Sequence, residues 1–219
     1  MKDIAYKEKY IDDELLKRIK DFLKETNDTL HGKPYEATGN GASHLKKEGC
    51  ADIPLRLDYP NNPINEVIEK LKKDTGDFFI HESSIRYLYY PYTAHSDVRS
   101  SEVMIENKKK YRHGYTFLIP LSWKSGYVPG TAFFDSPPKE GQDLYIEHQA
   151  MLPKFQNERM ARNFGIEQLI TWKNPGDLIM WMNYKWHCTM NGGSWVYNEE
   201  EWCKEFISLE TYKFKDDIK

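Results

Sequence analysis

After Gly76 the chain is a succession of short β-type segments separated by turn residues, and this pattern constrains the fold more than any other feature. The segments are rich in aromatic and β-branched residues, which favour strands. They are Phe78–Ile80, Ser84–Tyr90, Tyr115–Leu121, Thr131–Phe134, Leu144–Glu147, Leu169–Trp172, Leu178–Trp181 and Phe206–Tyr212. Turns rich in Pro, Gly and Asn lie between them. About eight such strands in one chain predict a β-sandwich or jelly roll.

Two amphipathic helices are predicted ahead of the strands. Residues 12–26 place apolar side chains at helical spacing, and a second helix is predicted from Pro63 to about Lys73. The segment between them, Asn27–Pro60, is predicted to be irregular. We therefore expect one domain, residues 1–219, that is mainly β with N-terminal helices. Residues 1–77 would form a helical layer packed on one sheet of a jelly-roll core, residues 78–214.

The composition excludes several classes of protein. Aromatic residues make up 14% of the 219 residues, which is unlike a disordered chain. The 31 basic and 34 acidic residues give a net charge of -3, so a nucleic-acid partner is not expected. The apolar runs are too short to span a bilayer, and the N-terminus lacks the apolar core of a signal peptide. Three cysteines without metal-type spacing fit a reducing cytoplasm, where we expect the protein to reside.

The residues most informative about chemistry are His95-Ser96-Asp97 and, far downstream, His187. Side chains at positions i and i+2 of a strand point to the same side, so His95 and Asp97 are able to grip one ion. Two histidines and one carboxylate form the facial triad that holds iron(II) and leaves positions open for other ligands. By itself a His-x-Asp sequence is weak evidence, because a surface loop produces it easily.

The sequence around these residues strengthens the interpretation. A strand that ends at Tyr90-Pro91 precedes His95. Four further elements follow Asp97 in order: Tyr115–Trp123, Gly130–Asp135, Pro175–Cys188 and Lys204–Leu209. Over about Phe78 to Tyr212 this order resembles the iron(II)- and 2-oxoglutarate-dependent oxygenases, in particular their prolyl-hydroxylase-like branch.

The resemblance implies a double-stranded β-helix, which is a jelly roll, and a catalytic iron(II) held by His95, Asp97 and His187. It also implies 2-oxoglutarate as co-substrate and molecular oxygen as oxidant. The reaction would be hydroxylation of a C–H bond in a prolyl or other peptidyl side chain, or in a small molecule. His113 is the rival third ligand, although it lies close to His95 in the sequence.

The far carboxylate of 2-oxoglutarate needs a cation and a hydroxyl donor in a partly buried pocket. Lys204 opens the last strand and is the first candidate for the cation that pairs with the far carboxylate. Tyr90 is the candidate hydroxyl donor, and Arg86 shares a strand face with it, so Arg86 is the rival cation. Arg112 is a third candidate. An apparent insertion, Met190–Trp202, separates His187 from Lys204 and leaves the choice between Lys204 and Arg86 open.

Two non-enzymatic alternatives remain at this stage. One is a jelly-roll module that binds a metal or ligand without turnover. The other is a metal-free sugar-binding or structural β-sandwich, which would use the same aromatic strands without a matched His-x-Asp and distal histidine.

Overall fold

The strands form two antiparallel sheets whose facing side chains pack together. The computed structural model of the chain describes residues 3–31, 50–88, 96–97, 104–106, 109–124, 129–134, 166–191 and 204–214. In this part the larger sheet has the order β1 (Ile4–Lys7), β8 (Leu178–Met182), β5 (Lys109–Trp123), β10 (Lys204–Phe214), β3 (Phe79–Leu88) and β2 (Cys50–Pro54), with β4 (Met104–Glu106) beside β5. The smaller sheet has the order β7 (Ile166–Thr171), β6 (Pro129–Phe134) and β9 (His187–Asn191).

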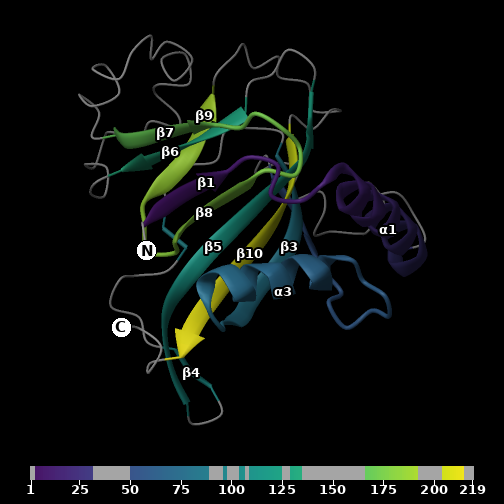
Figure 1. Cartoon of the computed structure of the whole chain (residues 1–219), viewed down its shortest axis with the longest axis horizontal. Helices are drawn as coiled ribbons and strands as arrows, with labels where there is room; N and C mark the ends of the chain where they lie inside the picture. The colour runs from purple at the N-terminus through teal and green to yellow at the C-terminus, as the bar shows by residue number, and fades with distance from the viewer. Residues whose placement is uncertain are drawn as a thin grey trace.

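Both predicted helices are present, and their apolar side chains share one core cluster with residues of the larger sheet. Helix α1 spans Asp13–His31, and helix α3 spans Ile64–Thr75 and lies across β5, β10 and β3 (Figure 1). The side chain of Asp12 accepts a hydrogen bond from the Leu15 backbone N–H (2.8 Å) and so caps α1. At Gly76 the backbone has a φ of 84°, which a residue without Cβ adopts easily, and its N–H closes α3 on the Lys72 carbonyl.

Alternation along the central strand β10 separates two cores. Ile207 and Leu209 face the helices, where they pack with apolar residues of α1 and α3. Phe206 faces the other way and packs with Phe133 and Trp181 between the two sheets. Residues of β10 that share this second face with Phe206 therefore line the interior of the jelly roll.

The predicted jelly roll with helices on one sheet is confirmed, but several boundaries differ. The predicted strands Phe78–Ile80 and Ser84–Tyr90 overlap one longer strand, β3, and residues 89–90 lie outside the described part of the chain. The N-terminal layer is not purely helical, because β1 and β2 pair with β8 and β3 at the edges of the larger sheet. Strand β2 and the end of α1 also fall within the segment predicted to be irregular. The predicted strand Leu144–Glu147 lies outside the described residues.

The turn before β8 fastens the N-terminal segment to the sheets. Asp177 is fully buried and accepts hydrogen bonds from the Tyr6 hydroxyl and from the backbone N–H groups of Lys9 (2.8 Å), Asn174 (2.7 Å) and Lys173 (3.2 Å). Burial alone raises the pKa of this carboxyl, but these hydrogen bonds outweigh it and lower the pKa below its usual value. Asp177 is thus a structural anion at the junction of β1 and β8.

No helix in the described part of the chain combines the length and apolarity needed to cross a membrane.

Candidate active site

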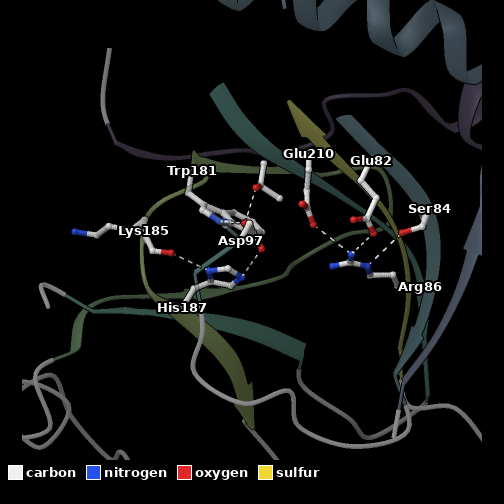
Figure 2. A network of polar contacts seen from close by, with 9 residues as sticks. Glu82, Ser84, Arg86, Asp97, Trp181, Lys185, His187 and Glu210 are labelled. Atoms are coloured by element: carbon white, nitrogen blue, oxygen red, sulfur yellow. Dashed lines mark hydrogen bonds and ion pairs between the residues drawn. The ribbon is translucent and has the colours of Figure 1, made fainter. Parts of the chain in front are cut away.

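Asp97 and His187 meet in the interior of the jelly roll, between the two sheets (Figure 2). His187 is the first residue of β9 and lies opposite Phe133 of β6. Its Nε2 atom is 3.7 Å from Oδ1 of Asp97, and the two side chains are only 9% and 3% exposed. The ring of Trp181 packs on the imidazole with a centroid separation of 4.6 Å. Two residues that are 90 positions apart in sequence thus share one shielded site.

Hydrogen bonds orient both side chains. The Nδ1 atom of His187 is 3.0 Å from the Lys185 carbonyl oxygen, which accepts a hydrogen bond only if Nδ1 carries the proton. This tautomer leaves the lone pair of Nε2 directed at Asp97. On the other side, Oδ2 of Asp97 accepts hydrogen bonds from the Thr116 hydroxyl (2.6 Å) and from the indole N–H of Trp181 (3.1 Å). The oxygen nearest to His187 is therefore Oδ1.

The pair fits a metal ion. Two donors that are each ~2.1 Å from a shared ion lie between ~3 Å and ~4.2 Å apart, depending on the angle at the metal. The 3.7 Å between Oδ1 and Nε2 falls in that range and is too long for a hydrogen bond. Partners that fix the tautomer of a histidine and the second oxygen of a carboxylate are typical of metal ligands.

The other predicted site residues lie either outside the described part of the chain or in strands of the larger sheet. His95 and Tyr90 lie outside the described residues, and within the described ranges no third His, Cys, Asp or Glu joins Asp97 and His187. The rivals His113 and Arg112 lie in β5 opposite Tyr212 and Lys213. That end of the β5–β10 pair is far from Lys204, which pairs with Trp123 at the opposite end.

Lys204 is a buried cation at the far end of the same interior cluster. It is 2% exposed, and its Nζ atom lies 4.3 Å from the ring centroid of Trp172 and 5.6 Å from that of Phe206. These rings belong to the cluster that continues through Phe133 and Trp181 toward His187. Charge-assisted hydrogen bonds are strong at such a buried position, so this position suits the carboxylate of a bound ligand.

Arg86, the rival cation, is directed at carboxylates of the protein itself. Its Nη2 atom donates to Glu82 (3.0 Å) and to Glu210 (3.3 Å), and its Nε atom donates to Ser84 (3.2 Å), as Figure 2 shows. In the β3–β10 register Arg86 lies opposite Phe206, whereas Lys204 lies opposite Leu88. The two predicted cations therefore occupy one interior wall, and Arg86 extends away from Lys204 toward Glu210.

Glu210 is a buried carboxyl within electrostatic reach of Asp97 in the Asp97–His187 pair. Burial raises its pKa, and repulsion from Asp97 raises it further, against the opposing effect of the Arg86 guanidinium, so that the pKa lies at about 7. Its ordinary value is 4.5. Two carboxylates within electrostatic reach are a common feature of sites that bind cations.

Solved structures of similar fold, at low sequence identity, include the following proteins. HygX from Streptomyces hygroscopicus, solved with nickel and 2-oxoglutarate bound, superposes with a TM-score of 0.52 and 10% identity over 97% of this chain and 83% of HygX. The non-heme alpha ketoglutarate dependent carbocyclase SnoK from nogalamycin biosynthesis superposes with a TM-score of 0.51 and 10% sequence identity, over 96% of this chain and 80% of SnoK. This chain has their fold. No protein-family model and no curated protein sequence matches it.

A second HygX structure, with nickel, 2-oxoglutarate and hygromycin B bound, superposes with a TM-score of 0.50 at 9% identity over 97% of this chain and 82% of HygX. The jelly roll expected from the sequence is thus the fold of proteins solved with a metal and 2-oxoglutarate.

Sequence reasoning missed two residues of the site, Thr116 and Glu210. Thr116 lies two positions before the core residue Leu118, and Glu210 lies four positions after the core residue Phe206, so alternation places each on the same interior face as that core residue. A polar residue in phase with core residues of an alternating strand is the signal that would have drawn attention to them.

Proposed function

We propose that the chain is an iron(II)- and 2-oxoglutarate-dependent oxygenase that hydroxylates a C–H bond of its substrate. The observation that carries this proposal is the Asp97–His187 pair, 3.7 Å apart and oriented by Thr116, Trp181 and the Lys185 carbonyl inside the jelly roll. A carboxylate and a histidine in this arrangement are two members of a facial triad.

The metal would be held by Asp97 and His187 with His95, which lies two residues before Asp97 in the sequence. Bound iron(II), with 2-oxoglutarate and oxygen, supplies the oxidation of the C–H bond. The protein's own task is to fix the ligands and keep water away. Trp181 does both, since its indole N–H holds Asp97 while its ring covers His187.

Lys204 is the residue proposed to bind the far carboxylate of 2-oxoglutarate. Its ammonium lies at the opposite end of the aromatic cluster from His187, as a ligand reaching from the metal into the interior requires. Arg86 is less suited to this task, because its guanidinium extends away from Lys204 and lies beside Glu82 and Glu210. Tyr90 remains the proposed hydroxyl donor.

The substrate would approach along the interior wall of β3 and β10 and is a prolyl or other peptidyl side chain, or a small molecule. The HygX structure with hygromycin B is an example of a small molecule bound by a protein of this fold. The acidic and polar residues of the wall favour a polar substrate over an apolar one.

Formation of succinate from 2-oxoglutarate under air, with and without iron(II), tests the proposal. We expect iron-dependent succinate formation by the full chain and its loss in Asp97→Ala. Asp58→Ala is the matched control, because Asp58 is exposed and pairs only with Arg56 among the described residues. A binding module without turnover would give no succinate. Equal rates with and without iron, or full activity in Asp97→Ala, would contradict the proposal.

A further inference from the structure

A polar strip lies on the interior wall of the larger sheet, where β3 and β10 run side by side. It consists of Ser84 and Arg86 of β3, Ser208 and Glu210 of β10, and Glu82 at its solvent end. Alternation places Ser208 and Glu210 on the same face of β10 as Phe206, which packs between the sheets. Buried polar side chains on an interior wall are costly to desolvate, so their presence there calls for a function.

The strip begins one strand away from the proposed metal site. In the β10–β5 register Glu210 lies directly opposite Thr116, and the Thr116 hydroxyl donates to Asp97. Side chains in directly opposite positions have Cβ atoms about 5 Å apart. A substrate that presents a C–H bond to a metal on Asp97 and His187 would therefore have its next functional group beside Glu210.

The hydrogen bonds of the strip fix Glu210 and leave one of its oxygens for a ligand. Oε1 accepts from Arg86, whose guanidinium is itself held by Ser84 and Glu82. Oε2 accepts a hydrogen bond from no residue that the structure describes, although Glu210 is only 8% exposed. Arg86 is thus a positioning residue, and Glu210 is the group that meets the ligand.

The charge of the strip selects the chemistry of that ligand. Within the described residues of the strip, Glu82 and Glu210 are balanced by Arg86 alone, so one negative charge remains when Glu210 is ionised, which is the form that a neighbouring cation favours. An anionic group would be repelled by both carboxylates, whereas an ammonium gains a charge-assisted hydrogen bond to Glu210. A neutral hydroxyl gains a weaker bond and leaves the charge uncompensated.

We propose that Glu210, oriented by Arg86, binds a protonated amino group of the substrate, so that the reaction acts on an amine-bearing compound. This inference rests on the proposed oxygenase function, because that function places the reacting carbon at Asp97 and His187. Substrate selection would then come from β10, while co-substrate binding comes from Lys204 at the other end of the same strand.

Binding of matched amine and non-amine probes tests the inference without requiring turnover. The full chain, loaded with zinc(II) and 2-oxoglutarate, is titrated with glucosamine and glucose, putrescine and 1,4-butanediol, and Nα-acetyl-lysinamide and Nα-acetyl-norleucinamide, with ligand-observed NMR as readout. We expect the amine of at least one pair to bind about tenfold or more tightly than its partner. Glu210→Gln should abolish this preference, and Glu210→Asp should keep it with lower affinity.

Glu205→Gln is the matched control, since Glu205 lies on the same strand, faces the other way and accepts a hydrogen bond from Ser122. Equal binding of both members of every pair, absence of binding by all three amines, or an amine preference that survives Glu210→Gln would overturn the inference. Succinate formation is measured in parallel. Succinate without amine preference overturns this inference alone, whereas amine preference without iron-dependent succinate supports the amine site and overturns the oxygenase function.

Discussion

Replacement of Lys204 by methionine should weaken the binding of 2-oxoglutarate while the protein still folds. The ammonium is 2% exposed and packs on Trp172 and Phe206. Methionine has a similar length, no charge, and a thioether that packs well against aromatic rings. The fold should therefore tolerate the change, while the far carboxylate of 2-oxoglutarate loses its cationic partner.

The size of the effect follows from the burial. Removing one member of a buried ion pair costs about 3–5 kcal/mol, because the remaining charge is left desolvated. At about 1.4 kcal/mol per factor of ten, this corresponds to a loss of about 150- to 4,000-fold in affinity for 2-oxoglutarate.

A thermal-shift titration with 2-oxoglutarate and manganese(II) measures both binding and folding. The parent chain should be stabilised by 2-oxoglutarate, and Lys204→Met should show little shift from its own melting temperature without ligand. Lys204→Arg should keep part of the shift, because the charge remains. Lys173→Met is the exposed control, next to Trp172 in sequence. A normal shift in Lys204→Met, or its loss in Arg86→Met instead, would refute the assignment.

Three further predictions concern the surroundings of the site. Thr116→Val should weaken manganese(II) binding about 10- to 100-fold in a calorimetric titration at unchanged melting temperature, and unchanged affinity would show that the hydroxyl does not orient Asp97. Asp177→Ala should lower the free energy of unfolding in urea by about 3 kcal/mol, because several N–H and O–H donors lose their acceptor, and a loss below about 1 kcal/mol would contradict this. Glu210→Gln should flatten the pH dependence of stability in the metal-free protein. Burial, with repulsion from Asp97, raises the pKa of Glu210 from 4.5 to about 7, so the folded parent binds more protons than the unfolded chain in this interval. The free energy of unfolding of the parent should therefore fall by up to about 3 kcal/mol as the pH rises from 4.5 to about 7. Parallel curves of unfolding free energy against pH for the parent and Glu210→Gln would refute this.

The parts of the fold that the sequence predicts are those with strong periodicity. Helix α3 follows from the apolar stripe of Ile64, Val67, Ile68 and Leu71, all of which are buried against the larger sheet. The central strands follow equally well, because burial on both faces requires continuous apolar runs such as Phe117–Leu121.

The missed strands lack such a local signal. Strand β1, Ile4–Lys7, has four residues flanked by charged side chains, and it exists because β8, Leu178–Met182, offers a partner far away in the sequence. Strand β9 begins with His187 and enters the segment interpreted as an insertion, so its pairing with β6 depends on tertiary context. Pairing between distant segments is invisible to local periodicity.

The site is predictable to a similar degree. Asp97 and His187 follow from their residue types and order, and the structure brings them together. Their partners do not follow, because the Lys185 carbonyl and the Thr116 hydroxyl act through geometry that residue type alone does not reveal. The role of Arg86 also depends on which carboxylates the neighbouring strand brings beside it.

Equilibrium binding of 2-oxoglutarate to the full chain, with and without iron(II) and in the absence of oxygen, tests the central claim most directly. If Asp97 and His187 hold the metal and Lys204 holds the far carboxylate, one 2-oxoglutarate binds per chain when iron is present. Binding is then lost without iron, in Asp97→Ala and in Lys204→Met. Binding of equal strength without iron, or in Asp97→Ala, would contradict the account.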